Sequence, residues 1–304
     1  MRTVIAALAL SFLAAGVQAN TITVCGDGTC DYTSINAAID AADPGDVILL
    51  SAETYTEGEV INTDGKAITI RGVLDKAGEP ASVLDGANTH RLLTCQSGET
   101  GSTVFENLVI QNGSAAGLEI PNYAGGGMYN LSSSPTLRNC KFYSNVAHSG
   151  GGMHNEESEP ALTDCKFLGN NALEGGGMYN GDNSSPVLTG CTFTGNSAIN
   201  TFPDSHDGRG GAILSEETSS VTAVDCVFSG NEPDSILGNF TTSSAPCTPG
   251  DMDGDEDVDA DDFVALRDQI GVEALGCVAA DINGDGDVDA TDLALVLGAW
   301  GVCP

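Results

Sequence analysis

Oxygen-bearing side chains alternate along two segments near the C-terminus, DMDGDEDVDADD (251–262) and DINGDGDVDATD (281–292). Calcium binds six to eight hard oxygens on a flexible loop, and such alternation supplies them together with one backbone carbonyl. We therefore predict two Ca²⁺ sites. The predicted ligands are Asp251, Asp253, Asp255, Asp257, Asp259 and Asp262, and then Asp281, Asn283, Asp285, Asp287, Asp289 and Asp292. The sharp turn of such a loop favours Gly, so Glu256, at the position of Gly286, predicts a weaker first site.

A second set of reactive groups lies mid-chain. His154, Glu156 and Asp182 are the candidate catalytic residues, because two carboxylates about 5–9 Å apart can hydrolyse a glycosidic bond. The rings of Tyr129 and Tyr179, and Arg209 at the end of an insertion (200–209), are the candidate substrate-binding groups. The competing interpretation is a solvated acidic face, since neighbouring coils of any acidic solenoid bring carboxylates together.

These groups are carried by a repeat. The segments GGGMYNLSSSPTLRNCKFYSNVAHS (125–149) and GGGMHNEESEPALTDCKFLGNNALE (150–174) are followed by a longer copy from Gly175 and a decayed copy from Gly210. A period in this range indicates stacked repeats. In each copy a Cys precedes a Phe by two residues, which places both side chains on one face of a strand.

One repeat cannot bury its own Met, Phe, Cys and Leu side chains, whereas stacking like on like buries them. Short apolar pieces separated by Gly, Asn, Ser and Pro indicate strands and turns. We therefore predict an all-β solenoid, a single-stranded parallel β-helix, with Met, Phe and Asn columns. Thr33 or Ser34 is predicted to cap a short helix that covers the open end of the solenoid. Asn62-Thr63-Asp64-Gly65 is predicted to form a turn.

Four segments divide the chain. Residues 1–19 have the charged start, apolar core and small-residue cleavage pattern of a secretory signal peptide. Residues 20–240 form the predicted β-helix, 241–250 (TTSSAPCTPG) a linker, and 251–304 the calcium-binding module. A secreted, extracellular or cell-surface location follows, with no membrane insertion after signal cleavage. The formal net charge of −33 disfavours nucleic acid as a partner.

Cysteines have two predicted uses in an exported chain. Cys25 and Cys30 flank a short turn and are predicted to form a disulfide. The repeat-column residues Cys140, Cys165, Cys191 and Cys226 are small buried groups, with disulfides between stacked neighbours left open.

Three family resemblances rest on these residues, two for the repeat region and one for the C-terminal module. SINAAIDAADPGDVILLSAETYTEG (34–58) with GKAITIRG (65–72) resembles the opening of pectin-lyase-like right-handed β-helix proteins. The GGGM and F-x-x-N elements are similar to repeats of bacterial surface β-helix proteins, including the polymorphic outer-membrane family. Residues 251–304 resemble dockerin modules, which consist of duplicated calcium-loop–helix units. The resemblances imply a right-handed solenoid followed by a small α-helical module.

Dockerins bind cohesins, and the resemblance implies a cohesin-like or cell-envelope anchoring partner. At the contact positions this chain has Ala260-Asp261 and Ala290-Thr291, with Arg267 in the first helix and Leu297-Gly298 in the second. That differs from the Ser-Thr and Lys-Arg pattern of cellulosomal dockerins.

Three functions remain open for the β-helix. The first is calcium-dependent anchoring of a polysaccharide-binding or polysaccharide-degrading surface. The second is a non-catalytic adhesin or structural spacer. The third is a polysaccharide lyase or glycoside hydrolase. A polysaccharide or cell-surface glycan is the expected ligand.

Overall fold

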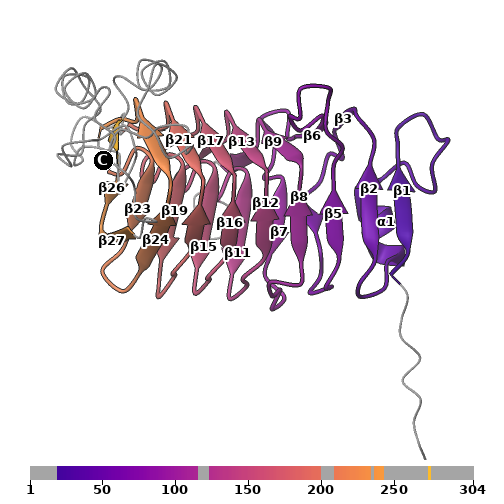
Figure 1. Ribbon diagram of the computed structural model, residues 1–304, viewed down its shortest axis with the longest axis horizontal. Helices are drawn as coiled ribbons and strands as arrows, with labels where there is room; N and C mark the ends of the chain where they lie inside the picture. Colours follow the sequence, from indigo (N-terminus) through magenta and orange to yellow (C-terminus); the bar gives the residue numbers. More distant parts are fainter. Residues whose placement is uncertain (1–18, 116–122, 200–208, 234–235, 243–272, 275–304) are drawn as a thin grey trace, which may run out of the picture.

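The structure is a computed structural model that describes residues 19–115, 123–199, 209–233, 236–242 and 273–274. Within these residues the chain winds into a parallel β-helix whose coils stack along one axis (Figure 1). Residues 1–18 of the predicted signal peptide (1–19), residues 200–208 of the insertion and both predicted calcium loops lie outside the described residues.

Four sheets run along the solenoid, and each coil contributes one short strand to most of them. The nine-stranded sheet contains β1 (Thr21–Val24), β2 (Val47–Leu50), β5 (Thr69–Arg71), β8 (Val104–Glu106), β12 (Thr136–Arg138), β16 (Ala161–Thr163), β20 (Val187–Thr189), β24 (Ser220–Val224) and β27 (Asn239–Thr242). The eight-stranded sheet contains β3 (Thr54–Tyr55), β6 (Ser82–Asp85), β9 (Leu108–Gln111), β13 (Lys141–Tyr143), β17 (Lys166–Leu168), β21 (Thr192–Thr194), β25 (Val227–Ser229) and β28 (Glu273–Ala274).

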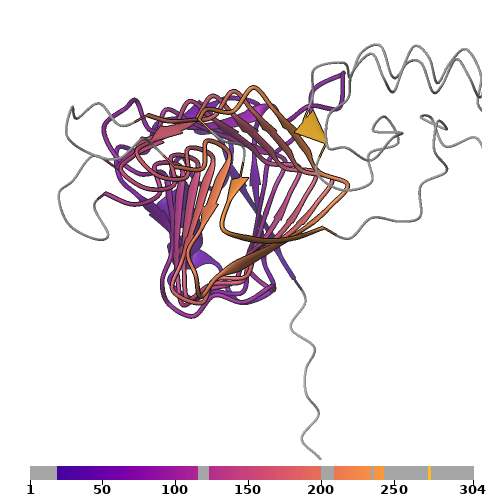
Figure 2. The same ribbon diagram turned by 90° about the vertical axis from the view of Figure 1, so that its left-hand side faces the viewer.

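The seven-stranded sheet, which carries the candidate site, contains β4 (Ile61–Asn62), β7 (Leu93–Cys95), β11 (Met128–Leu131), β15 (Met153–Glu156), β19 (Met178–Gly181), β23 (Ile213–Ser215) and β26 (Ile236–Leu237). The four-stranded sheet contains β10 (Ser114–Ala115), β14 (Val146–Ala147), β18 (Asn171–Ala172) and β22 (Ser197–Ala198). Among the described strands every pair is parallel except β25 with β28. Figure 2 looks down the axis along which the coils stack and shows the sheets enclosing a common interior.

Identical residues stack in the interior, as the repeat predicted. Met128, Met153 and Met178 pair in register on β11, β15 and β19, and all three are buried. The rings of Phe142, Phe167, Phe193 and Phe228 stack at centroid distances of 4.6, 4.5 and 5.1 Å. Each aromatic pair adds about 0.5–1.5 kcal/mol beyond its buried area, so the Phe column holds successive coils together.

The predicted Asn column lies at bends and is fully inside the fold. Asn145 donates to Asn170, which donates to Asn196, at 3.0 and 2.9 Å. The left-handed backbone of each bend lies one residue before the Asn, at Ser144, Gly169, Gly195 and Gly230. The Asn itself is therefore free to direct its amide along the stack, which satisfies buried polar groups that would otherwise be costly.

The helix α1 (Ile35–Ala41) closes the N-terminal end of the solenoid (Figure 1). Its N-cap is Ser34, whose hydroxyl accepts the amide of Ala37, and Ile35, Ala38 and Ile39 are buried. This matches the prediction and has a physical reason, since an open end would expose unpaired strand edges. The segment at 62–65 forms the predicted turn, with left-handed Asp64 and Gly65.

The cysteines also separate as predicted. Cys25 and Cys30 form a disulfide. Cys140, Cys165, Cys191 and Cys226 are buried free thiols. The disulfides left open for stacked neighbours are therefore absent from this column.

Candidate functional site

Strands β11, β15, β19 and β23 place one residue of each repeat on the outer side of the seven-stranded sheet. Successive side chains of a strand point to opposite faces, so the residue after each interior Met points outward. The register pairs Tyr129 with His154, His154 with Tyr179, and Tyr179 with Leu214.

The column is covered instead of exposed. Tyr129 is fully buried, and His154 and Tyr179 are 3% and 9% exposed. The His154 ring lies 4.7 Å from the Tyr179 ring and 5.4 Å from the Tyr129 ring, and the guanidinium of Arg91 covers Tyr129 at 4.8 Å. In-register strands lie about 4.8 Å apart, so these rings contact one another. Tyr129 therefore has no exposed ring face in this structure.

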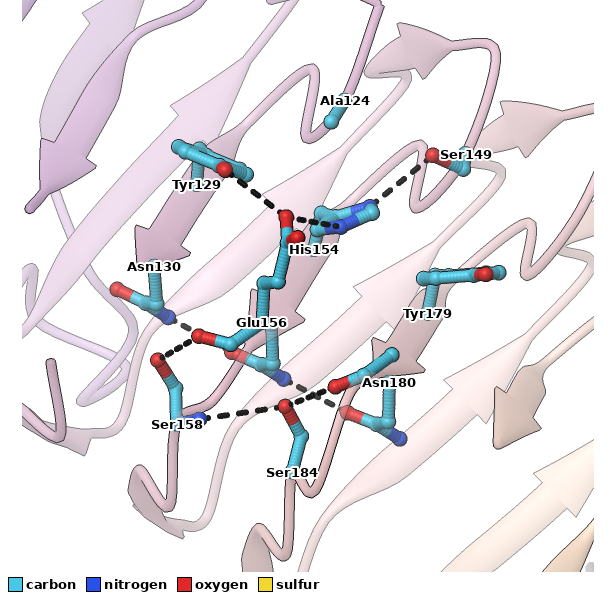
Figure 3. A network of polar contacts seen from close by, with 12 residues as sticks. Ala124, Tyr129, Asn130, Ser149, His154, Glu156, Ser158, Tyr179, Asn180 and Ser184 are labelled. Carbon is cyan, nitrogen blue, oxygen red and sulfur yellow. Dashed lines mark hydrogen bonds and ion pairs between the residues drawn. The ribbon is translucent and has the colours of Figure 1, made fainter. Parts of the chain in front are cut away.

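His154 lies between a hydroxyl and a carboxylate (Figure 3). Its Nδ1 is 3.0 Å from Oγ of Ser149, and its Nε2 is 3.8 Å from Oε2 of Glu156. The same carboxylate oxygen accepts the phenol of Tyr129 at 3.0 Å. Tyr179 donates to Glu216 on the next coil. The rings of Tyr129 and Tyr179 on either side, the hydrogen bond with Ser149 and the nearby Glu156 carboxylate hold the imidazole in one orientation.

The protonation states follow from burial. Burial lowers the pKa of His154, so the imidazole is neutral near pH 7. The contact with His154 lowers the pKa of Glu156, which keeps it an anion. Burial raises the pKa of Tyr129 and of Tyr179, so both phenols stay protonated and donate.

A pocket of about 190 Å³ opens beside this group. Its lining includes His154, Glu156, Tyr179, Asp182, Tyr123 and Glu216. The structure therefore brings the three candidate catalytic residues and Tyr179 to one pocket. Tyr129 does not line it and reaches it only through Glu156.

A wider hollow of about 400 Å³ adjoins the first and shares Asp182 and Glu216 with it. Arg209 lines this second hollow. Its guanidinium forms an ion pair of 2.6 Å with Glu174, and both side chains are partly exposed. Arg209 therefore lies at the rim where the two hollows meet, and its guanidinium is paired with the Glu174 carboxylate.

Sequence reasoning missed Ser149, Tyr123 and Glu174 as parts of this site. Bridges align Ala124, Ser149, Glu174 and Arg209 in one column beside the aromatic column. Interior columns repeat the same residue, whereas these two outer columns change residue at every coil. Outer columns elsewhere vary as well, for example Tyr143, Leu168 and Thr194, so this variation alone does not single out the site in the sequence.

The described residues contain no group of three or more His, Cys, Asp or Glu side chains arranged to hold a metal ion. No helix in the described part of the chain is long and apolar enough to cross a membrane.

Comparison with known proteins places these coils in a family. Residues 91–245, about half of the chain, match the family described as right-handed β-helix region. The chain belongs to this right-handed β-helix family. The match confirms the predicted hand of the solenoid. Residues 249–298 match the dockerin type I domain, which confirms the resemblance of the C-terminal module to dockerins.

Several solved structures resemble this β-helix protein. Pectin methylesterase from carrot is 12% identical with a TM-score of 0.45, and the match covers 74% of this chain and 82% of that one. PemA, a pectin methylesterase from Erwinia chrysanthemi, is 11% identical with a TM-score of 0.45, covering 74% and 82%. The pectate lyase Pel9A is 15% identical with a TM-score of 0.39, covering 84% and 85%. At these identities the likeness concerns the fold alone. No curated protein matches the chain.

Proposed function

We propose that this protein is an exported, polysaccharide-contacting β-helix that is tethered through its C-terminal dockerin module. The observation that carries the proposal is the join of the two families in one chain, a β-helix region at 91–245 and a dockerin type I domain at 249–298. We place the signal peptide at 1–19, the β-helix at 20–240, the linker at 241–250 and the module at 251–304. Its location is then extracellular or at the cell surface.

The module is proposed to bind two Ca²⁺ ions through the twelve residues predicted above. Carboxylates, an amide oxygen and backbone carbonyls are hard oxygen donors, which is the donor set that Ca²⁺ takes. The bound ions would hold each loop in shape and present the following helix to an anchoring partner of the cohesin type. Ala260-Asp261 and Ala290-Thr291 stand at the contact positions, so we expect a cohesin-like partner different from those of cellulosomal dockerins.

The glycan contact is proposed at the pocket beside His154. Glu156, Asp182 and Glu216 supply acceptors for sugar hydroxyls, and Arg209 supplies donors at the rim. A carboxylate-lined pocket on a chain of net charge −33 repels a polyanion. The favoured ligand is therefore a neutral glycan, in preference to a polyuronate.

Retention on insoluble polysaccharides tests this function. The full chain with Ca²⁺ is incubated with neutral and acidic polysaccharides, beside Glu156→Gln, Asp182→Asn and the control Glu59→Gln, which alters an exposed carboxylate on an N-terminal coil. Hydrogen bonds to charged groups contribute about 1.5–3 kcal/mol, so each pocket variant should bind about 10–100-fold more weakly. Equal retention of all variants, or retention only on polyuronates, would contradict the proposal.

A further inference from the structure

Ser149 and His154 meet on a single coil of the repeat. The neighbouring coils place Ala124 beside Tyr129 and Glu174 beside Tyr179 at the corresponding positions. Only on the coil of Ser149 does a hydroxyl face an imidazole among these described pairs, with Oγ 3.0 Å from Nδ1. Both groups line the pocket of about 190 Å³.

We propose that Ser149 is a nucleophile activated by His154, and that the pocket hydrolyses small acyl esters carried by neutral sugars. This inference rests on the proposed glycan-contacting function and names the chemistry of that same site. A serine hydroxyl becomes a nucleophile when an adjacent base takes its proton and a third group orients the base. Here Nδ1 of His154 is the base, and Glu156 lies on the Nε2 side of the ring.

The charge states fit these roles. If the Ser149 hydroxyl donates to Nδ1, the imidazole proton sits on Nε2 and faces the Glu156 carboxylate. That carboxylate also accepts the Tyr129 phenol, which fixes its position. Burial lowers the pKa of His154, so the ring is free to accept a proton near neutral pH. A protonated ring would then be stabilised by Glu156.

The oxyanion of the intermediate needs a donor. The backbone amides of Gly150, Gly151 and Gly152 are committed to carbonyls of the next coil. Tyr123 lines the pocket, and its ring lies 5.2 Å from the ring of His148. Burial and the carboxylates of the pocket raise the pKa of Tyr123, so its phenol remains a donor. We assign the oxyanion contact to Tyr123.

The reaction balances without a co-reactant other than water. Oγ of Ser149 bonds to the ester carbonyl carbon, and its proton passes to Nδ1 of His154. The bond from that carbon to the sugar oxygen breaks, and the sugar hydroxyl leaves with the proton from His154. Water, deprotonated by the same nitrogen, then attacks the acyl-Ser149. The products are a small carboxylic acid and the restored serine.

The pocket also selects the substrate class. Its volume lies below the roughly 300–1,000 Å³ of pockets that enclose drug-sized ligands. A short acyl group such as acetyl fits that size. The carboxylates of Asp182 and Glu216 at its lining disfavour acidic acyl groups and esters of uronic acids.

Covalent labelling tests the nucleophile directly. The full chain with Ca²⁺ is treated with a phosphonofluoridate probe and analysed by intact mass and peptide mapping, and acetate release is measured on an O-acetylated neutral polysaccharide. Ser149→Ala should lose the label and reduce acetate release about 10³-fold or more. Tyr123→Phe should keep the label and lower kcat about 10²-fold or more. The matched control is Ser184→Ala, which removes a buried hydroxyl that donates to the Gly181 carbonyl instead of an imidazole; it should keep both readouts.

The outcomes separate the two proposals. Retention on neutral glycan without label or acetate release would overturn the nucleophile and leave the binding function standing. A label or an acetate release that survives in Ser149→Ala would overturn it as well. Release of acetate from a small aryl acetate that depends on Ser149, without glycan retention, would support the nucleophile and contradict the glycan-contacting function.

Discussion

The side-chain amide of Asn145 donates to the side-chain oxygen of Asn170, one coil further along, at 3.0 Å inside the solenoid. The same oxygen accepts the Asn145 backbone amide, and the Asn170 amide donates to the Phe142 carbonyl. The Asn170 amide also donates to Asn196 on the following coil, so one side chain satisfies polar groups on both neighbouring coils. The interior of this β-helix therefore depends on polar ladders as well as on apolar columns.

Replacing Asn170 by Ala should destabilise the protein strongly. The change leaves several buried backbone and side-chain groups without partners, at about 1–3 kcal/mol for each. We expect the free energy of unfolding, measured with denaturant, to fall by about 3 kcal/mol or more. The control is Asn171→Ala, which alters the adjacent exposed residue. Equal stability of the two variants would contradict the ladder's role.

The glycine triplets should tolerate no side chain. Gly150 has a φ of 64°, and an added Cβ would lie 2.2 Å from the Met153 carbonyl oxygen. Gly169 also has a positive φ, but no atom lies within 4 Å of its added Cβ. Gly169→Ala should therefore lower the free energy of unfolding by only roughly 1–2 kcal/mol, the penalty of left-handed backbone at a residue with a Cβ. Gly150→Ala should prevent folding of the coil. Thermal unfolding and soluble yield would show the difference, and similar losses in both would refute the steric explanation.

The buried, stacked thiols of Cys140, Cys165, Cys191 and Cys226 should be unreactive in the native protein. Burial raises the pKa of Cys165, and contact with its thiol raises that of Cys191. Reactivity requires an accessible thiolate. A thiol reagent followed by peptide mapping should label neither residue until denaturant is added. Rapid native labelling at Cys165 would mean that the coils open in solution.

Stability should decrease as the pH falls below about 6.5. Burial lowers the pKa of His154, so the unfolded chain binds its proton at a higher pH than the folded chain. Stability then rises with pH through the ordinary range of histidine and is lost on acidification. His154→Tyr, which copies Tyr129 and Tyr179 of the adjacent coils, should flatten this dependence between pH 7.5 and about 5 in denaturant titrations. If the free energy of unfolding of the variant changed with pH as steeply as before, the pH dependence would come from other groups.

Glycine in place of Glu256 should strengthen the first calcium loop. The second predicted loop has Gly286 at the corresponding position, where calcium loops of this type need a sharp turn. Calorimetric titration of the full chain is expected to show two unequal Ca²⁺ affinities, and Glu256→Gly should bring the weaker one toward the stronger. Asp285→Ala, which removes a proposed ligand from the second loop, should abolish one of the two. Two equal sites in the unaltered chain would contradict the prediction.

The repeat by itself determined the solenoid, because a coil of this length cannot bury its Met, Phe and Cys side chains alone. That physical requirement predicts the columns of Met128 and Phe142 and the parallel register. The spacing of the repeat adds the column of Asn145. The helix after Ser34 followed from local signals as well, through its cap and its apolar face. Both are properties of short stretches and of their spacing.

The candidate site depended on contacts between columns, which spacing does not encode. Strand alternation placed Tyr129, His154 and Tyr179 on the outer side of the sheet. Only the tertiary structure showed that their rings pack face against face and so bury one another. It also brought Ser149, a bridge residue between β14 and β15, against the imidazole of His154. Backbone hydrogen bonds to the preceding coil hold Ser149 in place, so the hydroxyl and its base meet only in the folded stack.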